Sequence, residues 1–366
     1  MKRILPLLIV LSLGATAYGC KDKSDDKKAA NNPANPGGQT GSGTGDGTPG
    51  APTQEEINTN PIDGVDPPTV ILEAGAFTDG PVWHAGLGVL FFSTPLGDGA
   101  LYRMLPDGRV LKIRDGASKD GTQPIGNTVN ANGDIITVEA KRVVKMTAGA
   151  GDPATIATSY PVAGAPPQAP PAAADAGADQ PPVSTPGQFD TLNDVVARKD
   201  GTLYVTDPGY FATPIANRIY RIDPSGAVSV VEAFDDVPRP NGVALSPDEK
   251  TLYVSFTQPV QGTLPFIRKY IVNDDGTLGE WTKFADIGPE DSSPDGLAVD
   301  KVGNIYVATK AGVQVFKTDG TSWGTVPVPE KPTGLSFGGE DLKTLYITTE
   351  GVKIWQVKTK LAGISE

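Results

Sequence analysis

The chain has very few of the side chains that commonly build reactive or metal-binding sites. Its 366 residues include one cysteine (Cys20), one histidine (His84) and three methionines. A single cysteine excludes an internal disulfide, so the folded part must be stabilised by its core. No Ser/His/Asp arrangement can be built around His84, which we interpret as a packed or surface residue. A glycine-rich phosphate-binding loop is also absent from the sequence.

Positive charge is scarce as well. The chain has 31 Lys and Arg against 43 Asp and Glu, a net charge of −12. Removal of Lys2 and Arg3 with an N-terminal signal would make it −14 (−12 − 2). Because no basic stripe accompanies this balance, we expect no nucleic-acid partner.

The first 19 residues are predicted to be an export signal. A basic start precedes a short apolar run over residues 4–17, which is too short to span a membrane and is typical of a secretory signal. The following Ala17-Tyr18-Gly19-Cys20 resembles the bacterial lipobox, in which the cysteine is lipidated and becomes the mature N-terminus. We therefore predict an exported lipoprotein anchored through Cys20, and Lys21 favours the outer membrane. The alternative is an ordinary cleaved signal with an incidental cysteine.

Two further segments have biased compositions. Residues 20–66 are polar and rich in Gly, Pro, Asn and Thr, so they cannot bury enough apolar surface to offset the entropy of ordering. We predict a disordered tether there. Residues 148–186 include AGAPPQAPPAAADAGADQPP and are predicted to be an Ala/Pro-rich surface loop inserted into the folded domain.

The folded domain is predicted over residues 67–366 and contains one pattern six times. Each copy opens with a short apolar strand, and a turn, a second strand, a third strand and a weaker fourth strand follow. The opening residues are Asp79, Asn127, Asn193, Asn241, Asp295 and Thr333, at intervals of 48, 66, 48, 54 and 38 residues. Four short strands in about 40 to 50 residues are typical of a propeller blade. We predict an all-β fold, a six-bladed β-propeller with four-stranded blades.

The segment PTVILEAGAFT precedes the first copy and has no unit of its own. We predict that it is the outer strand of the last blade, which would close the ring and remove an open sheet edge. The sequence shows no convincing helix.

The six opening residues are all oxygen donors. In a propeller the first strand of each blade lines the central channel, so these residues should lie near one mouth of it. Two carboxylates, three amides and a hydroxyl suit a hard cation such as Ca²⁺. Asp-Gly and Asn-Gly are also turn formers, and on residue type alone the two interpretations are equal. The recurrence of an oxygen-bearing side chain at the same position in all six blades favours the interpretation of these residues as metal ligands.

Several stretches resemble a known family when they are taken together and in order. They are FTDGPVWH, LNDVVARKDGTLYVTDPGY, RPNGVALSPDEKTLYVS, SPDGLAVDKVGNIYVA and PTGLSFGGEDLKTLYIT. The chain resembles the gluconolactonase, regucalcin (senescence marker protein) and luciferin-regenerating-enzyme-like family of six-bladed propellers. The resemblance covers residues 68 to about 358.

The resemblance implies one divalent metal at the channel mouth, with Ca²⁺ favoured and Zn²⁺ or Mg²⁺ as alternatives. The positions that match the family's ligands are Asp79, Asn193, Asn241 and Asp295. The ligand that matches Asp295 is also the favoured general base. The implied activity is metal-dependent hydrolysis of a small lactone or related ester, and we expect a monomer.

Substrate contacts are predicted for Asn193, Asn127, Asp207 and Thr191, although a turn-closing role is the alternative for Asp207. Two departures from the family pattern favour an alternative function. Asp79 replaces the usual glutamate, and Thr191 stands where some members carry a substrate-binding arginine. The alternative is a non-catalytic ligand-binding or interaction propeller with a structural metal.

Overall fold

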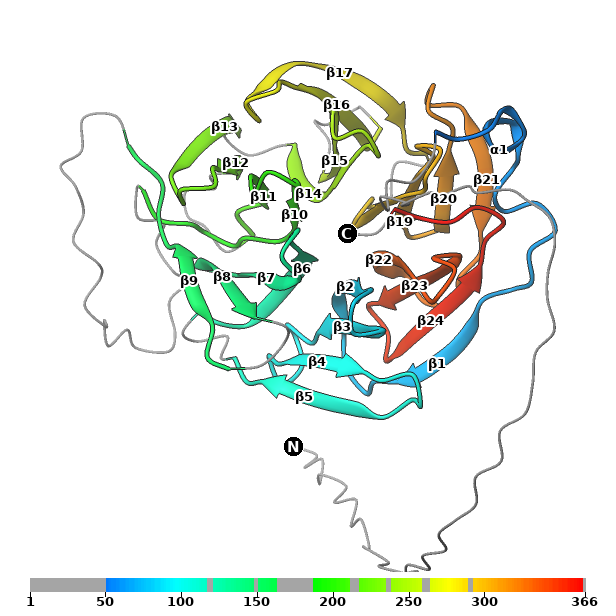
Figure 1. Ribbon diagram of the computed structural model, residues 1–366, viewed down its shortest axis with the longest axis horizontal. Helices are drawn as coiled ribbons and strands as arrows, with labels where there is room; N and C mark the ends of the chain where they lie inside the picture. Colours follow the sequence, from blue (N-terminus) through cyan, green and yellow to red (C-terminus); the bar gives the residue numbers. More distant parts are fainter. Residues whose placement is uncertain are drawn as a thin grey trace, which may run out of the picture. The chain divides into compact units, whose positions relative to one another are not determined.

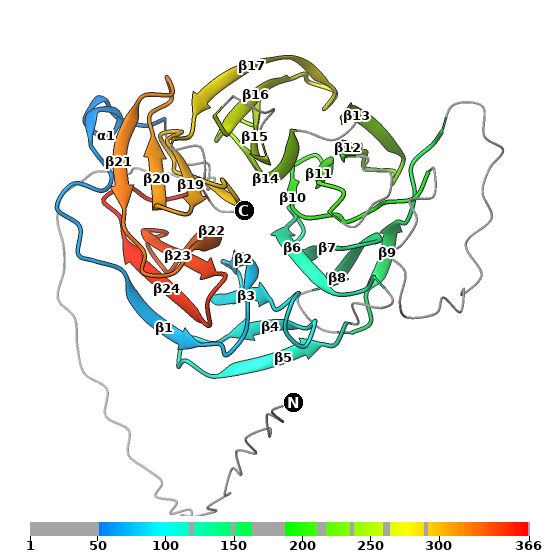
Figure 2. The same ribbon diagram turned by 180° about the vertical axis from the view of Figure 1, so that it is seen from behind.

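The computed structural model describes residues 51–116, 121–147, 151–162, 187–210, 217–234, 238–258, 264–288 and 292–364. Six four-stranded antiparallel sheets surround a central axis, and the first strand of each blade lies nearest that axis (Figure 1). Figure 2 shows the same ring from behind. The predicted six-bladed β-propeller with four-stranded blades is confirmed.

The strands follow the chain blade by blade. Blade 1 consists of β2 (Asp79–His84), β3 (Val89–Ser93), β4 (Leu101–Met104) and β5 (Val110–Arg114). Blade 2 consists of β6 (Pro124–Val129), β7 (Asp134–Glu139), β8 (Arg142–Thr147) and β9 (Ala154–Ala157). Blade 3 consists of β10 (Val195–Ala197), β11 (Leu203–Asp207), β12 (Asn217–Ile222) and β13 (Val228–Phe234). Blade 4 consists of β14 (Arg239–Leu245), β15 (Thr251–Gln258), β16 (Phe266–Val272) and β17 (Leu278–Asp286). Blade 5 consists of β18 (Leu297–Val299), β19 (Ile305–Thr309), β20 (Gly312–Phe316) and β21 (Ser322–Val326). Blade 6 consists of β22 (Pro332–Gly338), β23 (Thr344–Thr349), β24 (Lys353–Lys358) and the N-terminal β1 (Thr69–Glu73).

The ring is closed by the strand from the start of the domain. β1 pairs antiparallel with β24, with Thr69 opposite Gln356 and Glu73 opposite Lys353. β1 lies on the outer side of β24 in Figure 1. The predicted closure is confirmed, and it leaves the last blade without an unpaired outer β24 edge.

The core is divided into six apolar clusters, and each cluster lies between two neighbouring blades. Side chains of a strand alternate between its two faces, so one strand serves two clusters. In β3, Val89 and Phe91 pack toward blade 2, whereas Leu90 and Phe92 pack toward blade 6. This packing fixes the angle between blades and therefore the spacing of the inner strands around the channel.

Two predicted flexible segments are partly ordered, and the predictions need correction there. Within the predicted tether, Gln54–Asn58 forms the helix α1, which the Thr53/Glu56 capping box stabilises, and Ile62 packs against the cluster between blades 5 and 6. Within the predicted insertion, β9 completes blade 2 and Tyr160 packs against Phe189. The polar composition concealed a few apolar anchors in both segments.

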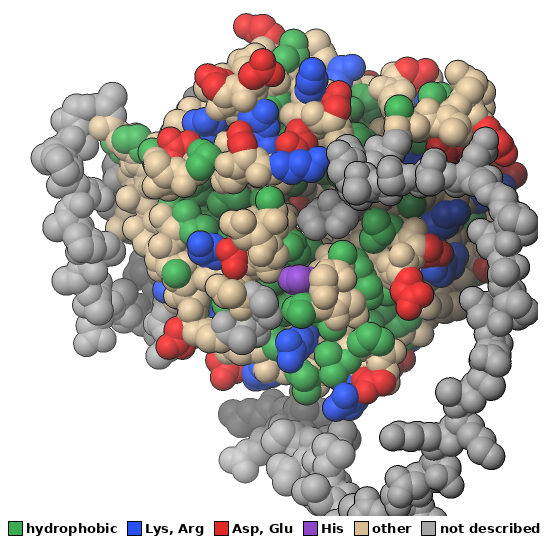
Figure 3. Space-filling model, in the orientation of Figure 1, with side chains coloured by type: hydrophobic (Ala, Val, Ile, Leu, Met, Phe, Trp, Pro, Cys, Tyr) green, Lys and Arg blue, Asp and Glu red, His purple; other side chains and the backbone are tan. Residues whose placement is uncertain are grey.

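The remaining parts of those predictions, residues 20–50, 148–150 and 163–186, lie outside the described residues, as do Cys20 and the predicted signal. No helix in the described ranges is long and apolar enough to cross a membrane. On the face shown in Figure 3, Lys and Arg side chains are interspersed with Asp and Glu.

Candidate functional site

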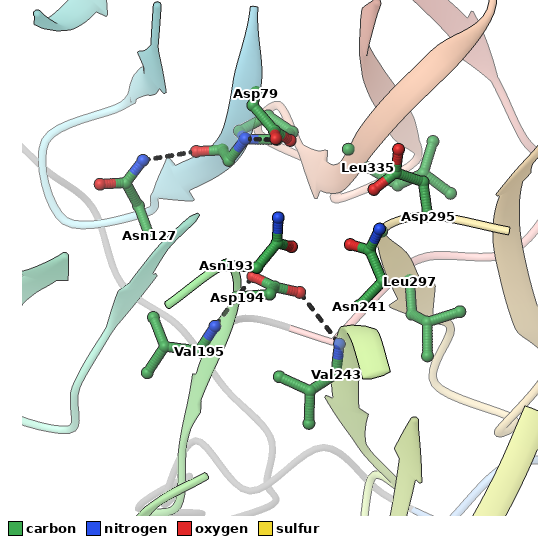
Figure 4. Close-up of a pocket in the computed structure, with 14 residues that line it drawn as sticks. Asp79, Asn127, Asn193, Asp194, Val195, Asn241, Val243, Asp295, Leu297 and Leu335 are labelled. Atoms are coloured by element: carbon green, nitrogen blue, oxygen red, sulfur yellow. Dashed lines mark hydrogen bonds between the residues drawn. The ribbon is translucent and has the colours of Figure 1, made fainter. Parts of the chain in front are cut away.

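A polar pocket lies at the end of the channel where the inner strands begin. The space at this mouth is about 410 Å³, and that volume includes open solvent. Figure 4 shows its lining, which includes all four predicted metal ligands, Asp79, Asn193, Asn241 and Asp295. The sequence comparison of blades therefore brought together side chains that are up to 216 residues apart (295 − 79).

The inner strands are irregular at this end. The pairing of the first two strands changes register between Asp79 and Val82 in blade 1, and between Pro240 and Val243 in blade 4. Such bulges are common beside functional sites because they redirect side chains that a regular ladder would place elsewhere. Asp79 and Asn241, which lie at these two bulges, both line the pocket.

Asn241 has an amide group whose orientation is fixed by its neighbours. Its Nδ2 donates to the hydroxyls of Tyr210 (3.1 Å) and Thr257 (2.7 Å). The Thr257 hydroxyl itself donates to the Pro294 carbonyl, so it must accept from the Asn241 nitrogen. The amide oxygen, Oδ1, is consequently left facing the pocket, buried and with no hydrogen-bond partner among the described residues.

Asp295 lies beside Asn241 and is positioned through its backbone. The Ser255 hydroxyl donates to the Asp295 carbonyl (2.7 Å), and the Asp295 N–H donates to Ala308 (2.9 Å). Burial raises the pKa of the Asp295 carboxyl to about 7, with Lys331 opposing the rise. The Lys331 Nζ is 3.7 Å from Asp295 Oδ2.

Asp79 begins β2 on the other side of the pocket. Its Oδ1 accepts from the Gly80 N–H (2.8 Å). Burial, followed by the charge of Asp295, holds the pKa of Asp79 well above its ordinary value. A buried carboxylate whose pKa is raised further by a second carboxylate is suited to bind a cation, because the cation relieves the repulsion between them.

Asp194 is a third pocket carboxylate that the sequence analysis missed. Its Oδ1 and Oδ2 accept from the Val195 and Val243 N–H groups, both at 2.9 Å, so it ties blade 3 to blade 4 (Figure 4). Burial raises its pKa to about 6, although these hydrogen bonds oppose the rise. The signal for it was present: Asp194 occupies the position where blades 4, 5 and 6 have glycine. Beside it, the Asn193 side chain points into the pocket.

The ladder register corrects the alignment of the six blade openings. The first regular pair of each inner strand begins at Val82, Asn127, Val195, Val243, Leu297 and Leu335. Two residues earlier stand Gly80, Ile125, Asn193, Asn241, Asp295 and Thr333. Asp79 is thus displaced by one position and Asn127 by two, because apolar residues alone do not fix register across a bulge.

Asn127 lines the pocket, and its amide forms hydrogen bonds within the protein, so the substrate contact remains a prediction. Its Nδ2 donates to the Gly80 carbonyl (2.7 Å) and the Ser93 hydroxyl (2.9 Å), and its Oδ1 accepts from Thr137 (2.8 Å). It turns away from the pocket centre in Figure 4. Asn127 therefore supports the strand that carries Asp79.

Asp207 and Thr191 are placed behind the pocket rather than in its wall. Asp207 has no exposed surface, and its carboxylate accepts from the N–H groups of Asp190 (2.9 Å) and Thr191 (2.8 Å). Thr191 is 3% exposed. Neither lines the pocket. The predicted substrate contacts of these two residues are corrected here. Asp207 instead holds the backbone of the segment that leads to Asn193, a role close to the turn-closing alternative.

His84 lies at the far end of β2, and its ring nitrogens contact the Gly133 carbonyl and the Leu87 N–H. It is a packed residue, as the sequence indicated.

The donor set fits a hard divalent cation. Two carboxylates and two amides converge, and the buried Asn241 Oδ1 lacks any donor in the described part of the chain. Oxygen ligands of this kind suit Ca²⁺. Within the described ranges no three His, Cys, Asp or Glu side chains form a metal-binding group by themselves, so a cation in this pocket would also need the amide oxygens of Asn193 and Asn241.

The chain belongs to the family described as the SMP-30/Gluconolactonase/LRE-like region, whose model matches residues 77–351. The sequence match and the six-bladed fold therefore agree on the family of this propeller, and the predicted family is confirmed.

Curated relatives include lactonases. A gluconolactonase of Zymomonas mobilis is 31% identical over 192 residues, which cover 48% of this chain and 52% of that protein. The pentonolactonase XacC of Haloferax volcanii is 34% identical over 174 residues, which cover 46% of this chain and 55% of that protein. The chain spans about half the length of these relatives.

Solved structures share the fold over most of the chain. A gluconolactonase from Xanthomonas campestris has a TM-score of 0.63 at 24% identity, covering 82% of this chain and 96% of its own. Regucalcin from Agrobacterium tumefaciens, described as a calcium-binding protein, has a TM-score of 0.63 at 17% identity with the same coverage.

Proposed function

We propose that the protein is a divalent-metal-dependent hydrolase of lactones or related esters. The observation that carries the proposal is the Asn241 amide oxygen, which is buried, unpartnered among the described residues and aimed into a pocket shared with Asp295 and Asp79. An unsatisfied buried acceptor is costly unless a ligand satisfies it. The likeness to gluconolactonase and pentonolactonase sequences supports the reaction class.

In this proposal Asp79, Asn193, Asn241 and Asp295 hold the cation, which when bound would polarise the carbonyl oxygen of the substrate. Asp295 accepts a proton from water, because it is a pocket carboxylate held next to the place where the substrate carbonyl would bind the cation. The water oxygen forms a bond to the carbonyl carbon. The ring C–O bond then breaks, and the ring oxygen takes up the proton, which gives a hydroxy acid.

Ca²⁺ is the favoured metal because all four proposed ligands are oxygens and none is a histidine or cysteine. Zn²⁺ and Mg²⁺ are the alternatives. Metal analysis of the purified protein by mass spectrometry would identify the resident ion, and a soft metal without Ca²⁺ or Mg²⁺ would contradict the assignment.

The activity is tested with a panel of lactones, with EDTA treatment, with Ca²⁺ or Zn²⁺ added back, and with the Asp295→Ala variant. Hydrolysis that EDTA abolishes, metal restores and Asp295→Ala lacks would support the enzyme. Metal binding without turnover of any lactone would leave the non-catalytic ligand-binding propeller, which the shorter Asp79 and Thr191 favour. Absence of metal binding would leave a protein-interaction module.

We also propose that the protein is exported and anchored to the outer membrane through a lipid on Cys20, with residues 20–50 as a tether for a monomeric propeller. The basic start, the short apolar run and the placement of the single cysteine support this. Metabolic labelling with a fatty acid should mark the wild-type protein and not Cys20→Ser. Equal labelling of both would exclude Cys20 as the lipidated residue.

A further inference from the structure

Lys331 lies next to the pocket residue Asp295 and does not itself line the pocket. It immediately precedes β22, and its carbonyl accepts from the Glu350 N–H (2.9 Å), which fixes its backbone to the adjacent strand end. Its Nζ pairs with Glu350 Oε1 and lies 3.7 Å from Asp295 Oδ2. The Lys331 side chain is only 20% exposed, whereas Glu350 is 47% exposed. The ammonium group is thus held at the pocket edge.

Lys331 is the only Lys or Arg that forms an ion pair with a pocket carboxylate in the part of the chain that the structure describes. Its charge also acts on Asp79 across the pocket. Arg239, the other nearby cation, is directed elsewhere: it donates to the Pro208 carbonyl (3.2 Å) and packs on the Tyr210 ring.

The ammonium has donors to spare. A lysine carries three N–H groups, and among the described residues one hydrogen bond, to Glu350, is formed. The 3.7 Å separation from Asp295 is an ion pair and is longer than a hydrogen bond. A polar gap of this length is commonly bridged by an oxygen that bonds to both groups.

The chemistry of the pair selects the bridging group. An oxygen between Lys331 and Asp295 must accept from the ammonium and donate to the carboxylate. A hydroxyl does both, and so does water, which a substrate hydroxyl can replace because it reproduces the same hydrogen bonds. A carboxylate cannot donate and would face Asp295 with like charge, and a methylene would leave both partners unsatisfied.

We propose that Lys331, together with Asp295 Oδ2, binds a hydroxyl group of the substrate and so makes the site selective for hydroxylated lactones. The inference rests on the proposed lactone hydrolysis. Lys331 is a specificity-determining residue in this proposal and takes no part in bond breaking.

The experiment compares two six-membered lactones, D-glucono-1,5-lactone with hydroxyls and δ-valerolactone without them, on the wild type, Lys331→Met and Lys331→Arg. Lys358→Met is the matched control, because Lys358 is also on blade 6 but is 64% exposed and pairs with Asp341 away from the pocket. Ca²⁺ affinity is measured by calorimetry for every variant.

For Lys331→Met we expect a KM for gluconolactone that rises about 10-fold, the size of one lost charge-assisted hydrogen bond, while any change in kcat that comes from the lost effect of Lys331 on Asp295 is the same for both lactones. The KM for valerolactone should not change, Lys331→Arg should restore most of the loss, and Lys358→Met should match the wild type. Ca²⁺ affinity should not weaken, since removal of a cation cannot repel the metal.

An equal rise in KM for both lactones, no rise for either, or weaker Ca²⁺ binding in Lys331→Met would overturn the proposal. Failure of the proposed function is distinguishable, because the wild type would then turn over neither lactone. In that case calorimetry with gluconolactone decides: binding by the wild type that Lys331→Met loses supports the hydroxyl site, and equal or absent binding refutes it.

Discussion

Blades 3 to 5 and blades 6, 1 and 2 use the same backbone position in different ways. Two residues before the first regular pair, blades 3, 4 and 5 present Asn193, Asn241 and Asp295 to the pocket. At that position the other three blades have Thr333, Gly80 and Ile125. The Thr333 hydroxyl is buried and donates to the Thr78 carbonyl (2.7 Å), which joins blade 6 to blade 1.

The difference shows that a ring with repeated architecture can carry a one-sided site. The same backbone position supplies proposed ligands on one side and blade-to-blade contacts on the other. In the half with the proposed ligands, hydroxyls of the preceding blade hold the backbones of two of them: Thr206 donates to the Asn241 carbonyl (2.5 Å) and Ser255 donates to the Asp295 carbonyl (2.7 Å). Asp79 also lines the pocket, from the residue just before Gly80, which is the equivalent position in blade 1.

The largest effect is expected at Asp295. Asp295→Ala removes both a proposed ligand and the proposed base, so hydrolysis should fall by about 10²- to 10⁴-fold. Thr333→Ala alters the equivalent position in the other half and should keep most of the activity. Steady-state kinetics on one lactone measures both. Comparable losses in the two variants would mean that the halves are not functionally distinct.

Asn241→Ala should weaken Ca²⁺ binding about 10-fold or more, because an oriented oxygen ligand is lost. Asn127→Ala is the counterpart: it frees the Gly80 carbonyl and should lower stability by about 1–3 kcal/mol while Ca²⁺ affinity stays within about 3-fold. Calorimetry and thermal melting separate the two effects. If Asn241→Ala left both quantities unchanged, its assignment as a ligand would be wrong.

Gly242→Ala tests how tightly the ligand strands pack. A Cβ at Gly242 would lie 2.4 Å from the Asp295 carbonyl oxygen and 2.7 Å from the Gly296 Cα, both rigid backbone atoms. We expect a loss of about 1–3 kcal/mol of stability, with weaker metal binding because Asp295 must shift. Gly288→Ala is the control, since a Cβ there meets nothing within 4 Å. Identical melting temperatures for the two variants would refute the close approach.

The smallest effect is a pH dependence of the metal-free protein. Burial raises the pKa of Asp194 to about 6 and that of Asp295 to about 7, from an ordinary value of 3.8. Because these pKa values are higher in the folded protein than in the unfolded chain, protonation of the two carboxylates stabilises the folded state. This contribution to the free energy of unfolding is fully present below pH 3.8 and is lost as pH rises through about 6 to 7.

The melting temperature without metal should therefore fall between about pH 5 and pH 8, and excess Ca²⁺ should reduce the fall. Scanning calorimetry with and without Ca²⁺ measures this. A metal-free protein that became more stable over this range would show that the pocket carboxylates are compensated by other charges.

Much of the fold could be predicted because the blade pattern is local. The second strand of each blade carries a short apolar run rich in β-branched or aromatic residues, such as Leu252-Tyr253-Val254 in blade 4, and a few turn residues separate it from the strand before it. β1 could be assigned to the last blade because an unpaired strand at the start of a ring has only one edge to occupy. The helix α1 was missed because its five residues contain few apolar side chains.

The site could be predicted in part. Asp79, Asn193, Asn241 and Asp295 carry oxygen donors beside glycine or aspartate at blade openings, and the resemblance to a family matched them to ligands. Asn127 was placed two residues from the equivalent position, Ile125, because side-chain type does not reveal where the regular ladder begins after the one-residue bulge in β6. Lys331 gave no signal, since lysines are common before strands and its partner Asp295 belongs to another blade.

The sequence by itself determined the six four-stranded blades, the closing strand and the chemical type of the mouth residues, because these depend on periodicity and residue type along short segments. Only the tertiary structure decided which of those residues face the pocket. Bulges and blade-to-blade hydrogen bonds turned Asn127 and Thr333 into supports, left the Asn241 oxygen free, and placed Asp194 and Lys331 beside the ligands. The physical reason is that side-chain direction and charge environment arise from contacts between blades, which no local pattern records.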